Sequence, residues 1–105
     1  MSVDGLRPES SDDIPWLRVA PVDGVVHGFG GCNSFNGPYR AGGTDITFGP
    51  LATTRRACAD AGRADLERAV LEVLTAADGY RVRETTLELL QGDRVRMTLV
   101  LGPSR

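Results

Sequence analysis

The chain has no lysine, one histidine and two cysteines among its 105 residues. All 12 basic side chains are therefore arginines, and we attribute this bias to genomic composition rather than to function. The net charge of −2 gives no electrostatic reason to expect nucleic acid or an acidic membrane as a partner. No apolar run approaches the roughly 20 residues that a membrane-spanning helix requires, so we expect no transmembrane segment.

Incomplete motifs exclude further classes of site. There is no Cys-X-X-Cys, so a thioredoxin-like role is not indicated. The segment 28–33 begins like a dinucleotide-binding fingerprint, but the third glycine is absent and no long helix follows directly, so we reject that function. Cys32, Cys58 and His27 fall short of a four-ligand zinc site unless a carboxylate comes from elsewhere. We expect no metal and no cofactor.

What is present fits one small globular domain. Hydrophobic residues make up 41% of the chain and charged residues 25%, which is ordinary for such a domain. Residues 1–13 are polar and are predicted to form a flexible tail, which leaves the domain at 14–102. Residues 1–5 show neither a basic segment nor an apolar segment of a signal peptide, so we expect a cytoplasmic protein.

Strand signals precede one helix. Alternating apolar residues and turn signals predict strands at 16–20, at 25–29, from Tyr39 onward and at 45–48. A helix is predicted over 60–77, capped by Asp60, with its apolar residues at helical spacing: Leu66, Val70, Val73, Leu74 and Ala77. Charged residues are expected on its other faces, namely Arg63, Glu67, Arg68 and Glu72.

After Gly79 the apolar period changes to two. This period predicts a meander of three antiparallel strands within 80–101, with a turn at 91–93. We therefore expect an α+β domain in which a curved, mainly antiparallel sheet of about six strands carries one helix.

Two blocks of sequence resemble the META domain family, which includes HslJ-like bacterial envelope proteins. The first block, 31–39, begins Gly-Cys-Asn, and the second, 46–58, contains Phe-Gly-Pro and a threonine-rich segment that ends on cysteine. The residues that carry the resemblance are Gly31, Cys32, Asn33, Phe35, Gly37, Tyr39, Phe48, Gly49, Pro50, Thr53, Thr54 and Cys58.

The resemblance implies the fold described above and a role in stress responses or in the bacterial envelope, with no defined activity. It also implies one more strand ahead of residue 16, and we expect that strand to be missing or recast in the polar tail. A missing strand would leave an open sheet edge, through which the chain would pair as a homodimer or assembly module. Because many members are exported, a periplasmic or other extracytoplasmic location, with an export signal trimmed from this sequence, is the alternative to a cytoplasmic one.

Cys32 and Cys58 allow three interpretations. They form a disulfide or close pair, or they are two reduced thiols in the core, or one of them is a reactive thiol in a redox or cysteine-dependent protein. On a strand, His27 and Cys32 would face opposite sides, which disfavours a Cys–His couple.

The function that we predict is a non-enzymatic binding or accessory domain with an unknown protein or small-ligand partner. Its recognition surface is predicted at Asn33, Thr53, Thr54, Arg55 and Arg56, because turn-specific residues gather there beyond what a meander needs and two adjacent arginines just before a helix can bind an anion. The alternative for 53–56 is a polar connector whose threonines satisfy backbone groups of the loop. The thiol protein and the assembly module are the alternatives.

Overall fold

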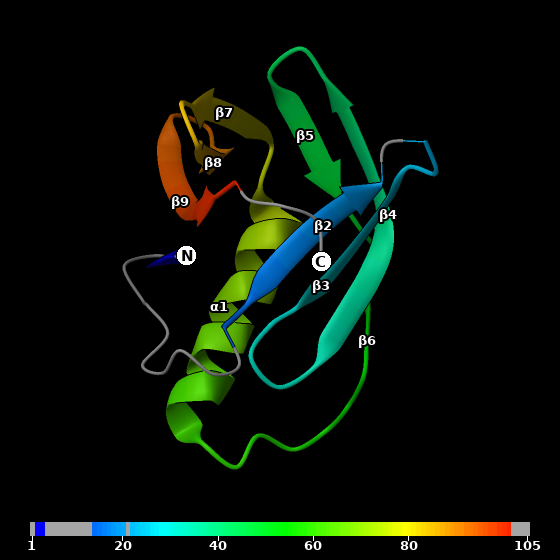
Figure 1. Ribbon diagram of the computed structural model, residues 1–105, viewed down its shortest axis with the longest axis vertical. Helices are drawn as coiled ribbons and strands as arrows, with labels where there is room; N and C mark the ends of the chain where they lie inside the picture. Colours follow the sequence, from blue (N-terminus) through cyan, green and yellow to red (C-terminus); the bar gives the residue numbers. More distant parts are fainter. Residues whose placement is uncertain (1, 4–13, 21, 102–105) are drawn as a thin grey trace.

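The computed structural model describes residues 2–3, 14–20 and 22–101. These residues form one nine-stranded sheet and one α-helix, with strand order β1-β9-β8-β7-β5-β4-β3-β2 (Figure 1). Strand β6 pairs with β4 outside this path, and every pair is antiparallel. The α+β class is thus confirmed, but the sheet has more strands than the six that we predicted.

The N-terminal block of the sheet follows the sequence prediction except for the start of one strand and one two-residue strand, at 52–53, that was not predicted. It contains β2 (Trp16–Ala20), β3 (Val25–Phe29), β4 (Ser34–Gly42), β5 (Asp45–Phe48) and β6 (Ala52–Thr53). The bounds of β2, β3 and β5 are as predicted, whereas β4 begins at Ser34 rather than at Tyr39. The first half of β4 pairs with β3 and its second half with β5, so the turn-like residues 36–38 lie within a strand.

The helix α1 (Ala61–Ala76) begins where its cap predicts. Asp60 Oδ1 accepts hydrogen bonds from Gly62 N at 2.7 Å and from Arg63 N at 3.3 Å, which satisfies two backbone groups of the first turn. The predicted apolar stripe is buried in full, with relative exposures of 0–5%: Leu66, Val70, Val73, Leu74 and Ala77. The stripe joins β-strand residues in one core that also holds Val26, Phe35, Ile46, Phe48, Leu89, Met97 and Leu99.

The C-terminal block is the predicted meander. It contains β7 (Gly79–Arg83), β8 (Thr86–Gln91) and β9 (Arg94–Val100), and the register between β8 and β9 shifts by one residue between Leu89 and Leu90. The period of two carries Leu89, Met97 and Leu99 into the core.

A short first strand, β1 (Ser2–Val3), corrects our expectation for the N-terminus. Val3 pairs with Met97 of β9 and is fully buried. Residues 2–3 therefore belong to the folded domain and not to a tail, and the sheet does have a strand ahead of residue 16. Two residues are too few to show a period of two, so no local pattern predicts β1. The rest of the predicted tail, 4–13, lies outside the described residues.

The sheet curves into a half-barrel around the helix (Figure 1). Its two blocks meet between β5 and β7, where Asp45 pairs with Gly79 and Tyr80 N donates to Thr44 O at 2.9 Å. Helix α1 packs against β1, β5 and β9. This arrangement directs the first turns of α1 towards the loop between β3 and β4.

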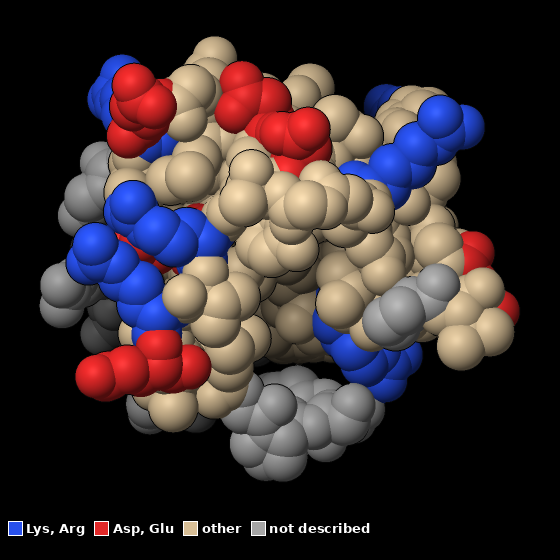
Figure 2. Space-filling model, turned by 90° about the horizontal axis from the view of Figure 1, so that it is seen from above, with Lys and Arg blue, Asp and Glu red and all other residues tan. Residues whose placement is uncertain are grey.

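Surface charge is mixed on the face shown in Figure 2, where the arginine side chains form separate groups with acidic side chains beside several of them. Within 2–3, 14–20 and 22–101, no helix is long and apolar enough to cross a membrane.

Candidate functional site

The Gly-Cys-Asn motif forms the turn between β3 and β4. Gly31 has a φ of +122°, a region that side chains rarely adopt, and Gly30 N donates to Asn33 O at 2.9 Å to close the turn. Asn33 is consequently directed inward and is only 8% exposed.

The Asn33 side chain uses its full hydrogen-bonding capacity. Its Nδ2 group donates to Glu67 Oε2 at 2.8 Å and to Arg56 O at 3.1 Å. Its Oδ1 atom accepts from Thr54 Oγ1 at 2.9 Å and from Arg56 N at 2.6 Å. An amide has two donor hydrogens and two acceptor lone pairs, so all four are satisfied. Asn33 thereby connects the turn to the segment before the helix and to the helix itself.

Glu67 is the helix residue that accepts hydrogen bonds from this turn. Its Oε1 accepts from Asn33 N at 2.5 Å and from Cys32 N at 3.1 Å, while Oε2 accepts from the Asn33 amide. Three donors therefore meet one carboxylate that is 9% exposed. Burial of a charged group is tolerated when it is hydrogen-bonded in this way.

We predicted that Glu67 lies on a solvent-facing side of the helix, and this prediction was wrong. Glu67 precedes Val70 by three residues and Leu74 by seven, so it lies on the apolar face. A carboxylate within that face was the available signal of a buried polar role.

Gly30 leaves room for the Glu67 side chain. A Cβ atom at this position would lie 2.7 Å from Glu67 Cγ and 2.9 Å from Oε1, closer than real Cβ contacts. Glycine at this position therefore allows a side chain of α1 to approach the backbone closely.

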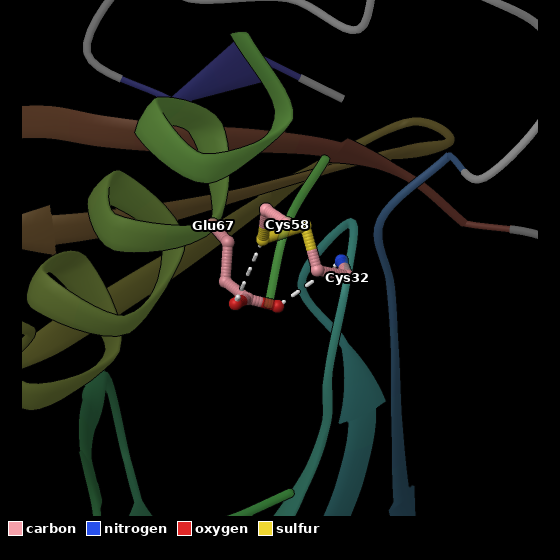
Figure 3. A group of neighbouring side chains, drawn as sticks. All are labelled: Cys32, Cys58 and Glu67. Atoms are coloured by element: carbon pink, nitrogen blue, oxygen red, sulfur yellow. Dashed lines mark hydrogen bonds between the residues drawn. A yellow bond between two sulfur atoms is a disulfide. The ribbon is translucent and has the colours of Figure 1, made fainter. Parts of the chain in front are cut away.

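Cys32 and Cys58 form a disulfide with a Cα–Cα distance of 5.6 Å (Figure 3). Of the three interpretations that we considered, the structure agrees with the first, a disulfide or close pair. Both cysteines are half-buried, and the Cys58 sulfur lies 3.9 Å from Glu67 Oε2. Because a disulfide sulfur carries no proton, we treat this approach as a contact. Closing a loop of this length stabilises the fold by about 3.5 kcal/mol in the chain-entropy treatment.

We refer to Cys32, Asn33, Thr54, Arg56, Cys58 and Glu67 as the Asn33 cluster. His27 is not part of it. His27 pairs with Arg18 and Asn36 in the middle of β3, between the buried Val26 and Gly28, so it faces the opposite side of the sheet. With both thiols in the disulfide, the cluster has no free cysteine to act as a nucleophile.

The residues of the predicted recognition surface separate into two groups. Asn33 is buried and committed to other residues, and the Thr54 hydroxyl bonds Asn33 and accepts from Ser34 N at 3.1 Å. Thr53 lies in β6 opposite Phe35 and is exposed. Arg55 and Arg56 are also exposed, although the backbone of Arg56 is bonded to Asn33.

Comparisons with known proteins agree with this fold. The sequence model of the META domain family matches residues 1–102. An NMR structure of a protein from Burkholderia xenovorans is similar, with a TM-score of 0.74 at 26% sequence identity, over 94% of this chain and 71% of that chain. No curated protein matches this chain.

Proposed function

This chain belongs to the META domain family, and we propose that it acts as a small non-enzymatic binding or accessory domain. The observation that carries this proposal is the connector between β6 and α1. Its backbone is fixed at Arg56 by two hydrogen bonds with the Asn33 side chain, which donates to Arg56 O and accepts from Arg56 N, while the side chains of Arg55 and Arg56 are exposed.

A fixed backbone with exposed arginines favours binding. Ordering a flexible loop costs free energy when a complex forms, and a connector that is already held in place avoids part of that cost. Arginine presents planar, bidentate donors that match carboxylate and phosphate groups. We therefore propose that the partner offers an acidic group to Arg55 and Arg56, with Thr53 beside them.

The test is capture of partners from a lysate of the native host, using the purified domain and the double variant Arg55→Ala, Arg56→Ala. We expect the variant to lose the captured partner while its melting temperature changes by less than about 2 °C, because exposed side chains contribute little to stability.

A matched control removes two arginines elsewhere. Arg40→Ala, Arg94→Ala changes two other exposed positions, on β4 and β9, and should leave capture unchanged. Equal losses of capture in both double variants would show that net charge alone matters. A parallel loss of stability and capture in the connector variant would contradict the proposal.

The thiol alternative has a chemical requirement. A cysteine that acts as a nucleophile or as a reductant would first need the Cys32–Cys58 bond to be reduced. The carboxylate beside Cys58 is that of Glu67, which already accepts three hydrogen bonds from Cys32 and Asn33, and His27 faces the other side of the sheet. We therefore place the binding function first.

The assembly alternative rests on β2, which pairs only with β3 among the described residues. In a two-fold antiparallel pairing of two β2 strands, the central residue Arg18 would face its own copy. Like charges directly opposite each other destabilise a strand pair. We therefore expect light scattering to find a monomer at high concentration, and a concentration-dependent dimer would revive this alternative.

A further inference from the structure

Three potential metal ligands meet in the Asn33 cluster. The Sγ atoms of Cys32 and Cys58 and a carboxylate oxygen of Glu67 all lie within 4.8 Å of one another (Figure 3). They come from the turn after β3, from the connector before α1 and from α1 itself. Among the described residues, no other group of three histidine, cysteine, aspartate or glutamate side chains is this close.

This group supplies the carboxylate that two cysteines alone lack. Thiolate and carboxylate donors both bind zinc, which prefers four ligands in a tetrahedron and leaves one position to water where the protein offers three. Two zinc–sulfur bonds of about 2.3 Å place their sulfur atoms about 3.8 Å apart. With Cα atoms 5.6 Å apart, the cysteines reach that geometry by rotation of their side chains.

The surroundings of Glu67 resemble those of a metal-binding carboxylate. Cys32 N and Asn33 N donate to Oε1, and the Asn33 amide donates to Oε2, which is also the oxygen that contacts the Cys58 sulfur at 3.9 Å. Hydrogen bonds of this kind orient metal ligands and increase affinity. Glu67 Oε2 is therefore the oxygen that would coordinate.

The charge of the reduced cluster is a second reason to expect a metal ion there. Two thiolates and one carboxylate would place three negative charges in a partly buried volume. The disulfide removes two of these charges, and a divalent cation neutralises two of them. Either state avoids the repulsion that a reduced, metal-free and ionised cluster would have.

We propose that reduction of the Cys32–Cys58 disulfide converts this cluster into a zinc site whose protein ligands are Cys32, Cys58 and Glu67. A dithiol reductant supplies two electrons and two protons, the S–S bond breaks, and the reductant leaves as its own disulfide. Zinc then binds both sulfurs as thiolates, and the two thiol protons pass to solvent. The disulfide and the metal exclude each other, so the redox poise of the compartment decides which form exists.

The test compares oxidised and phosphine-reduced protein. Zinc affinity is measured by competition with a chromophoric chelator, and Co²⁺ serves as a spectroscopic probe, since thiolate ligation gives charge-transfer absorption in the near ultraviolet. We expect one zinc ion per reduced chain and none per oxidised chain. The double variant Cys32→Ser, Cys58→Ser should bind none under either condition.

Glu67→Gln separates a zinc site from a mere pair of thiols. Loss of a ligand should weaken zinc binding by about 100-fold or more, whereas Asp65→Asn, an exposed carboxylate on the same helix, should leave it unchanged. Equal affinity of the reduced wild type and Glu67→Gln would overturn the proposal, as would zinc binding to the oxidised protein.

Circular dichroism covers the case in which the reduced chain unfolds. Recovery of the native spectrum on addition of zinc, and its absence in Glu67→Gln, would support the site. An unfolded reduced chain that zinc does not refold would count against it.

Discussion

The C-terminal meander and the Asn33 cluster are held together by different interactions. In the meander, β7, β8 and β9 pair in sequence order, and their inner face carries apolar side chains such as Leu89 and Met97. The Asn33 cluster joins a turn, a connector and a helix through hydrogen bonds between residues that are 21 to 35 positions apart along the chain. A periodic apolar pattern is enough for the first region, whereas the second needs particular donors and acceptors.

The difference predicts how each region responds to substitution. Apolar packing is shared among many neighbours, so the loss of one side chain is partly compensated by relaxation of the others. A polar cluster in which every hydrogen bond is made cannot compensate in this way, because each missing acceptor leaves a buried donor unpaired. Substitutions in the two regions test this contrast directly.

The largest expected effect is that of Glu67→Ala. This change leaves Cys32 N, Asn33 N and the Asn33 amide without their acceptor. We expect the free energy of unfolding to fall by about 4 kcal/mol, as measured by urea denaturation, since each buried unpaired group costs about 1–3 kcal/mol.

Its matched control is Glu72→Ala, an exposed glutamate on the same helix, which should change stability by less than about 0.5 kcal/mol. Hydrogen exchange should locate the damage in the Glu67 variant at residues 31–34 and 54–58 while β8 and β9 keep their protection. A loss below about 1 kcal/mol would mean that Glu67 does not hold the turn.

A smaller loss is expected for Leu89→Ala in the meander. Leu89 is fully buried opposite Met97, and its truncation should lower the free energy of unfolding by about 3 kcal/mol. Because Leu89 belongs to the common core, protection from hydrogen exchange should fall across the whole domain. Val95→Ala, at an exposed position of β9, is the control. If the Leu89 variant lost protection from hydrogen exchange only in β7–β9, the two blocks would unfold separately.

The smallest effect should follow Arg81→Ala. The Arg81 guanidinium contacts Glu88 at 2.7 Å on the outer face of the meander, but its side chain is 45% exposed. Exposed ion pairs are weak, so we expect a loss of less than about 0.5 kcal/mol that vanishes in high salt. A loss of unfolding free energy above about 1 kcal/mol would mean that polar contacts of the meander stabilise the fold as much as those of the Asn33 cluster.

The structure of the two regions could be predicted from the sequence to different extents. The period of two over 80–101 and the helical spacing from Leu66 to Ala77 were sufficient to predict β7, β8, β9 and α1. The strand β1 was missed because two residues show no period and its partner β9 lies at the other end of the chain. The start of β4 was misplaced because Gly37 and Pro38 are typical of turns.

The candidate site was predicted only in part. The Gly-Cys-Asn block was recognised and a Cys32–Cys58 pair was one of three interpretations, but Glu67, which connects them to the helix, was assigned to the helix surface. Asn33 was predicted to take part in recognition, and the structure uses all four hydrogen-bonding positions of its side chain internally.

By itself, the sequence determined the fold class, the family and the apolar faces of the main strands and helix. These depend on local periodicity and on motifs within short segments, which a single chain displays directly. Only the tertiary structure decided that Cys32 bonds Cys58, that Glu67 is the acceptor for the turn, and that the two sulfurs and one carboxylate meet. Those facts depend on which distant residues become neighbours when the half-barrel closes around α1, and no local pattern specifies them.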